Sequence, residues 1–98
     1  MQFLQDDPIH PGEILKDDFL AEYDLSVGQM AQDIGVSANA LSDILTARAG
    51  IGAELALRLS RYFGNSPEFW LNLQRAYDLA VAVRQTKGLD RIRPVRAA

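Results

Sequence analysis

The chain of 98 residues is predicted to fold as one all-α domain, an orthogonal bundle of five helices. Apolar residues recur at a spacing of three to four in five segments, and serine, proline and glycine separate these segments. No run alternates apolar and polar residues as a half-buried strand would. Hydrophobic residues make up 48% of the chain, which is enough for a core in a domain of this length.

The first helix is expected to begin at Pro11, after an extended lead-in over residues 1–10. Proline suits the first position of a helix because its missing N–H has no partner there in any case. Leu15, Phe19 and Tyr23 follow at every fourth position. This spacing predicts that the three side chains form one buried stripe.

Two short helices come next. Ser26 is the expected N-cap of a helix over residues 27–34, and Gly35 is expected to end it. Ser37 is the expected N-cap of a third helix that runs to about Thr46. The turn between the two helices is therefore only three residues long.

Two longer helices complete the bundle. The fourth is expected over residues 53–63, with Gly64 just past its end. Ser66 and Pro67 are typical of a helix start, and the apolar pattern of this fifth helix reaches Gln85.

Charge is unevenly distributed along the chain. Residues 1–45 hold nine acids and one base, whereas residues 46–98 hold nine bases and four acids. The domain is expected to span residues 11–86, and residues 87–98, with four bases and one acid, are expected to form a flexible basic tail. The asymmetry fits separate partners for the two halves, or a chance segregation of surface charge.

Several function classes are excluded by composition. Cysteine is absent, and His10, the only histidine, is expected to be a cap or a surface residue rather than a general base. Asp17 and Asp18 are neighbours on a helix and therefore point to different faces. They are expected to be solvated charges rather than a catalytic pair of carboxylates. No segment resembles a secretory signal or reaches the roughly 18–20 apolar residues that span a bilayer. We expect a cytoplasmic protein that is not an enzyme and needs no cofactor, metal, membrane or small-molecule substrate.

The second and third helices carry the strongest motif. Ala31 is small where two steeply crossed helices come closest, and Gly35 suits the turn. The positions that close the corner are all apolar: Met30, Ile34, Val36, Leu41 and Ile44. This pattern predicts a helix-turn-helix, and the five-helix arrangement around it resembles the lambda-repressor-like DNA-binding domains. Arg58 and Arg61, on the fourth helix, are expected to be solvated or ion-paired.

In such a motif the start of the recognition helix enters the major groove of DNA. Asn39 can form paired hydrogen bonds with adenine, and Arg48 is the nearest base to the DNA backbone. The glutamines of the second helix either donate to phosphate or stay solvated. The residues expected to contact DNA are Gln29, Gln32, Ser37, Ala38, Asn39, Ser42, Asp43, Thr46 and Arg48.

Two further segments are distinctive: HPGEIL at residues 10–15 and FWLNLQ at residues 69–74. Together with the helix-turn-helix, and with YFG at residues 62–64 and AYDL at residues 76–79, they resemble the HigA-type antitoxins, a family of Xre-type plasmid-maintenance antidote proteins. This resemblance covers residues 10 to about 84. It implies a dimeric repressor of its own operon that also neutralises a small basic RelE-like toxin (HigB) that cleaves mRNA, as in a type II toxin–antitoxin system.

The first half of the chain offers acidic residues for contact with a basic toxin. They include Asp6, Asp7, Glu13, Asp17 and Asp18. A two-fold dimer would set two recognition helices roughly 34 Å apart on a palindromic operator. Candidates for dimer or toxin contacts, which could also be ordinary exposed leucines, are Leu57, Leu71 and Leu79.

The chain departs from the family at several positions expected to hold DNA. Family members commonly have glutamine where Val27 stands and arginine where Ala38, Ala40 and Ala49 stand. Loss of these groups weakens the expected hold on phosphate. Two alternatives therefore stay open beside the antitoxin: a stand-alone Xre-type regulator without a toxin, and a protein-binding module that no longer binds DNA.

Overall fold

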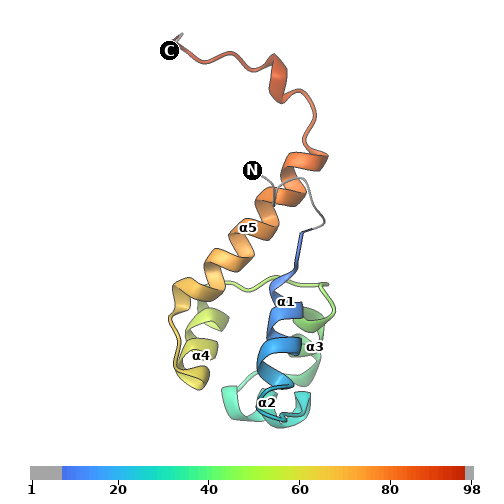
Figure 1. The fold of residues 1–98 in the computed structure, drawn as a ribbon, viewed down its shortest axis with the longest axis vertical. Helices are drawn as coiled ribbons and strands as arrows, with labels where there is room; N and C mark the ends of the chain where they lie inside the picture. The colour runs from blue at the N-terminus through green and yellow to red at the C-terminus, as the bar shows by residue number, and fades with distance from the viewer. Residues whose placement is uncertain (1–7, 97–98) are drawn as a thin grey trace.

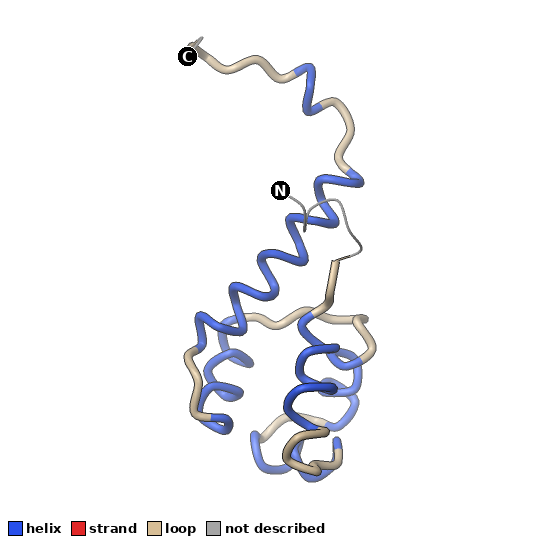
Figure 2. Tube along the Cα trace, viewed as in Figure 1, coloured by secondary structure: helices blue, strands red, loops and turns tan. Residues whose placement is uncertain are grey.

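The computed structural model describes residues 8–96 and shows an all-α architecture, with no strand in that part of the chain (Figures 1 and 2). The helices are α1 (Pro11–Ile14) with its direct π-helical continuation (Leu15–Leu20), α2 (Val27–Ile34), α3 (Ala38–Leu45), α4 (Ala53–Phe63) and α5 (Pro67–Gln85), followed by a 3-10 turn (Leu89–Arg91). With α1 and its continuation counted as one helix, the predicted fold class is confirmed for these residues.

The bundle has two sides, one made by α1, α2 and α3 and the other by α4 and the first half of α5 (Figure 1). The second half of α5 extends beyond the bundle, and the molecule measures 53 × 22 × 22 Å. Residues 87–96 consequently lie at the opposite end from α2 (Figure 1). Most of the expected lead-in, residues 1–7, falls outside the described residues, and the proposed domain limits stay predictions.

Serine caps begin three of the helices, as the sequence predicts. The hydroxyl oxygens of Ser26, Ser37 and Ser66 each accept a hydrogen bond from the backbone N–H three residues on, at 3.1, 3.0 and 3.1 Å. Gly35 and Gly64 end α2 and α4 in the left-handed conformation, with φ of 75° and 76°. A side chain in this conformation is strained, which explains glycine at both ends.

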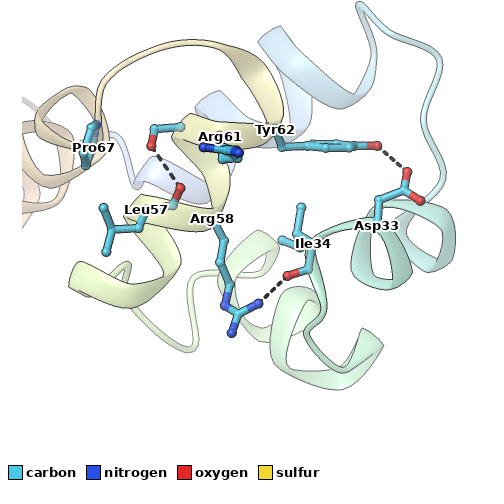
Figure 3. Close-up of a pocket in the computed structure, with 8 residues that line it drawn as sticks. Asp33, Ile34, Leu57, Arg58, Arg61, Tyr62 and Pro67 are labelled. Carbon is cyan, nitrogen blue, oxygen red and sulfur yellow. Dashed lines mark hydrogen bonds between the residues drawn. The ribbon is translucent and has the colours of Figure 1, made fainter.

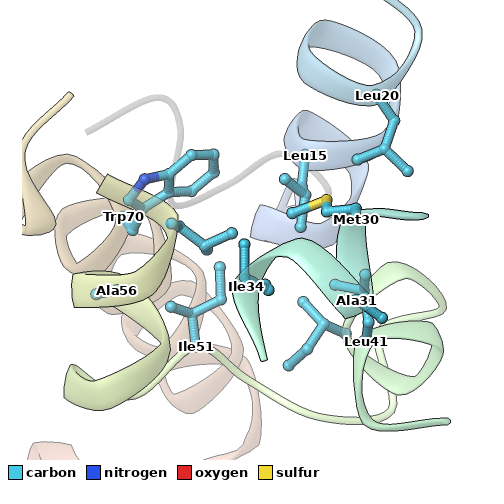
Figure 4. Close-up of a cluster of buried hydrophobic side chains, with 11 residues drawn as sticks. Leu15, Leu20, Met30, Ala31, Ile34, Leu41, Ile51, Ala56 and Trp70 are labelled. Carbon is cyan, nitrogen blue, oxygen red and sulfur yellow. The ribbon is translucent and has the colours of Figure 1, made fainter. Parts of the chain in front are cut away.

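One hydrophobic core joins all the helices (Figure 4). Leu15, Met30 and Leu59 are completely buried in it, and so is Trp70. The indole Nε1 of Trp70 donates to the Oδ1 of Asn65 at 3.0 Å, so the one polar atom of this large side chain keeps a partner. The core therefore fixes α5 against the helices that precede it.

The predicted stripe of the first helix is partly wrong. Leu15 is buried and Phe19 is half-buried against the core, as expected, but the next fully buried side chain is Leu20, five residues after Leu15, and Tyr23 is 57% exposed. The cause is the π-helical turn, in which the Ala21 N–H donates to the Lys16 carbonyl at 3.1 Å. The wider turn brings Leu20 to the core beside Phe19, and Tyr23 lies past the end of the helix.

His10 caps α1 from a buried position. Its Nδ1 accepts a hydrogen bond from the Gly12 N–H at 2.9 Å, and its ring meets the edge of Tyr77 at a centroid distance of 4.8 Å. The expected cap is confirmed, but the alternative of a surface residue is wrong because only 5% of His10 is exposed. Burial lowers the pKa of His10 below its usual 6.5, against opposing contributions from the Ala49 backbone and the charges of Glu13 and Asp78.

Gly12 lies where α1 approaches the end of α3. A Cβ added at Gly12 would overlap the backbone carbonyl oxygen of Ile44. Backbone cannot move aside as a flexible side chain can, so only glycine allows this approach. The spacing between α1 and α3 is therefore set by the absence of a side chain at Gly12.

We expect Gly12→Ala to lower the free energy of unfolding by about 1–3 kcal/mol, because the added methyl group must push α1 away from α3. Gly28 is the matched control, since it lies in α2 with open space around its Cβ position. Gly28→Ala should raise the free energy by about 0.5–1 kcal/mol through helix propensity. Urea unfolding measures both, and an unchanged Gly12→Ala protein would contradict the close approach.

The burial of His10 makes the stability of the fold depend on pH. Because burial holds the pKa of His10 below its unfolded value, the unfolded chain binds the proton more readily than the folded protein. The stabilisation is complete above about pH 6.5 and decreases as the pH falls toward the lower pKa of the folded state. We expect the melting temperature to fall between about pH 7.5 and about pH 5.5. His10→Asn retains a capping side chain without titrating and should lose most of this fall. An equal fall in melting temperature in both proteins would show that titratable groups other than His10 cause it.

Candidate nucleic-acid interface

The corner between α2 and α3 has the predicted construction. Gly35 takes the turn, and the Val36 N–H donates to the Ala31 carbonyl at 3.0 Å. Ala31 is 3% exposed, so a larger side chain would separate the two helices. The apolar side chains that close the corner are buried, or half-buried for Val36: Met30, Ile34, Val36, Leu41 and Ile44.

Helix α4 braces this corner through Arg58. The Nη1 of Arg58 donates to the Ile34 carbonyl at 2.8 Å, which satisfies a carbonyl at the end of α2 (Figure 3). Of the two alternatives expected for Arg58, solvation or an ion pair, the ion pair is present, with Arg58 Nε 3.9 Å from the Oε1 of Glu54. Both partners of that pair are well exposed, so its contribution to stability is small. The contact with Ile34 could not be predicted from the sequence, because Arg58 and Ile34 are 24 residues apart along the chain.

A second contact joins α4 to α2. The Tyr62 hydroxyl donates to the Oδ2 of Asp33 at 2.6 Å (Figure 3), and the Gln29 Nε2 donates to the Oδ1 of the same carboxylate at 2.7 Å. The hydrogen bond to Asp33 is the main cause that raises the pKa of Tyr62 above its usual 10.0. Sequence reasoning missed this network as well, since Tyr62 and Asp33 are 29 residues apart.

All nine residues expected to contact DNA are exposed on the corner or on the loop that follows it. Their role stays a prediction. The surface that they form, called the reading face from here on, comprises Gln29 and Gln32 of α2, the cap Ser37, then Ala38, Asn39, Ser42 and Asp43 of α3, and finally Thr46 and Arg48.

Some groups of the reading face are already engaged within the chain. The Ser37 oxygen caps α3, and the Thr46 hydroxyl donates to the Ser42 carbonyl at 2.9 Å. Asn39 and Gln32 have no side-chain hydrogen bond within residues 8–96. Their amides are therefore available to an external partner.

The loop after α3 holds Arg48 in place through its backbone. The N–H groups of Arg48 and Ala49 both donate to the Asp43 carbonyl, at 2.8 and 3.1 Å. Ala47 adopts a φ of 62°, a conformation that costs a non-glycine residue free energy. The chain thus turns sharply and carries Arg48 beside the C-terminal end of α3.

Metal-binding clusters and membrane-spanning helices are both absent from the part of the chain that the structure describes. Between residues 8 and 96, no group of three or more His, Asp or Glu side chains could hold a metal ion. No helix of that region is long and apolar enough to cross a membrane. An open groove of about 850 Å³ lies between α2 and α4, lined among others by Leu57, Arg61 and Pro67 (Figure 3).

Comparison with known proteins agrees with this geometry. The chain matches the helix-turn-helix family over residues 18–70. It is 38% identical over 72 residues to Antitoxin HigA-1 of Vibrio cholerae. The aligned region covers 74% of this chain and 68% of that protein.

Two solved structures are similar over nearly the whole chain. One is the Pseudomonas aeruginosa antitoxin HigA with the higBA promoter, 44% identical with a TM-score of 0.80, covering 91% of this chain and 99% of that one. The other is Pseudomonas aeruginosa PA4674 in complex with its operator DNA, 46% identical with a TM-score of 0.84, covering 90% and 97%. The chain therefore belongs to the helix-turn-helix family and, within it, to the HigA-type antitoxins.

Proposed function

We propose that this protein binds operator DNA as a dimer, represses its own operon, and neutralises a small basic RelE-like toxin that cleaves mRNA. One observation carries the DNA-binding part: the rigid corner at Gly35 presents an exposed polar face at the start of α3. This placement fits a recognition helix whose first turns enter the major groove. The similar HigA structure with its promoter supports the same assignment.

Base recognition is assigned to α3. Asn39 lies in the first turn, is exposed and has a free amide, so it can form paired hydrogen bonds with the edge of adenine. Ala38 can contact a thymine methyl group, and Ser42 can bond to either a base or a phosphate. Residues 27–45 contain no Lys or Arg. Hydrogen bonds are therefore assigned more of the binding than cationic contacts, and Arg48 is the one cation of the reading face.

The dimer is assigned to α5, which has a second apolar face that one protomer leaves uncovered. Phe69, Leu79 and Val83 are 38, 54 and 50% exposed, and Ala76 shares their face. Their spacing repeats that of a coiled-coil seam. Two copies paired along α5 would cover these side chains. Of the leucines singled out in the sequence, Leu79 falls on this face.

Asn39→Ala should weaken binding to the protein's own promoter by about 1–3 kcal/mol, because it removes contacts to one base. Its effect on stability should be small, since Asn39 is exposed. Mobility shifts and anisotropy titrations at several salt concentrations measure the binding. Arg48→Ala should instead reduce the slope of log affinity against log salt by about one per protomer, whereas Asn39→Ala should leave it unchanged.

A dimer variant completes this experiment. Leu79→Glu places a charge on the α5 face and leaves the reading face intact, so it should give a monomer by sedimentation and bind the promoter more weakly.

Normal promoter affinity of Asn39→Ala would show that the contact of Asn39 with a base is misassigned. If the unmodified protein shifted no promoter at low salt, with or without toxin, the repressor role would be wrong and a protein-binding module would remain.

Toxin binding is assigned to the acidic side of the first helix. Glu13, Asp17 and Asp18 are exposed there, whereas Asp6 and Asp7 lie outside the described residues. Carboxylates suit a basic nuclease because opposite charges steer association and exclude other partners. Neutralisation then requires only that the bound antitoxin keeps the nuclease from its RNA.

Where the neighbouring gene encodes a short basic protein, we expect co-expression of this chain to restore growth to cells that produce that protein. The combined change Asp17→Asn and Asp18→Asn should lower the association rate, most strongly at low salt. Glu54→Gln removes an exposed acid from α4 and serves as the control. A promoter shift without any toxin complex or growth rescue would instead support a stand-alone regulator.

A further inference from the structure

The hydrogen-bonded network of Tyr62, Asp33 and Gln29 connects α4 to the first turn of α2. Tyr62 donates to one carboxylate oxygen of Asp33 at 2.6 Å, and Gln29 donates to the other at 2.7 Å. Gln29 belongs to the reading face, whereas Tyr62 lies outside it. The carboxylate thus links a residue of the bundle to a residue expected at the DNA backbone.

The position of Asp33 needs an explanation. An acid in the last turn of a helix opposes the helix dipole, and a negative charge on a helix that approaches DNA repels phosphate. Both effects disfavour Asp33, which is the penultimate residue of α2. The two short hydrogen bonds that Asp33 accepts indicate that its carboxylate is present to bind the side chains of Tyr62 and Gln29.

For Gln29 the consequence is a fixed amide. A glutamine side chain is flexible, and its amide carries two N–H donors on one nitrogen and an oxygen acceptor. Asp33 accepts from that nitrogen, so the donor end of the amide is held at Asp33 and the second N–H remains for another acceptor. A donor ordered in advance loses less freedom when it binds.

We propose that Tyr62 and Asp33 are positioning residues that hold the Gln29 amide ready to donate its second N–H to a backbone phosphate of the operator. Tyr62 orients the carboxylate, and the carboxylate orients the amide. This inference rests on the proposed operator binding by α2 and α3. The first residue of α2 is Val27, whose side chain has no donor, so Gln29 supplies a donor within the same helix turn.

Tyr62→Phe is the most direct test because it removes one hydroxyl and changes no charge. We expect the dissociation constant for the operator to rise about twofold to tenfold, as for release of one ordered side chain. Tyr23→Phe is the matched control, since Tyr23 is exposed, packs on the same Phe63 ring and has no hydroxyl hydrogen bond within the described residues. It should leave operator affinity unchanged.

A double-mutant cycle separates positioning from a general loss of structure. In a Gln29→Ala background, Tyr62→Phe should have no further effect on operator affinity, because the amide that it positions is gone. Circular dichroism melting curves of all variants show whether the fold is retained. Independent losses that multiply in the double variant would overturn the proposal.

Asp33→Ala gives a test of sign. Removal of an acid near DNA strengthens binding if charge alone matters. Positioning predicts the opposite, a dissociation constant raised about twofold to tenfold. A tighter complex would overturn the proposal and show that the negative charge of Asp33 outweighs any positioning of Gln29. If the unmodified protein does not bind its operator at all, the proposed operator binding is wrong and this inference falls with it.

Discussion

The left-handed backbone of Gly35 sets the geometry on which the reading face depends. With a φ of 75°, this residue reverses the chain between α2 and α3 within a single turn, and Ala31 lets the two helices approach. Arg58 and Tyr62 then hold α2 in the bundle, because α4 binds the end of α2 at the Ile34 carbonyl and at Asp33.

The parts of the fold that follow local rules were predictable from sequence. Serine caps, the glycines that end α2 and α4, and the apolar corner depend on residues at most a few positions apart. The π-helical turn in the first helix was not predictable in this way. It moves burial from Tyr23 to Leu20, and the preference for Leu20 arises from packing against distant helices rather than from the local pattern.

The same distinction between local patterns and contacts of distant residues applies to the candidate site. Exposure of the reading face followed from helical periodicity once the corner was recognised. The contacts that brace it did not, since they join residues 24 and 29 positions apart, and an arginine or tyrosine on α4 has many possible partners. Gly12 is a similar case: Pro11 predicted the helix start, whereas the contact of Gly12 with Ile44 required the structure.

The scarcity of cations gives these contacts their importance. A protein that neutralises many phosphates tolerates loosely held side chains, because the attraction is long-ranged and weakly directional. Residues 27–45 carry no Lys or Arg, so the proposed binding to DNA depends, apart from Arg48, on amides and hydroxyls that act only at short range and in the correct orientation. The order of these side chains is then expected to influence affinity. A bundle that braces α2 from α4 is consistent with a recognition surface that depends on orientation more than on charge.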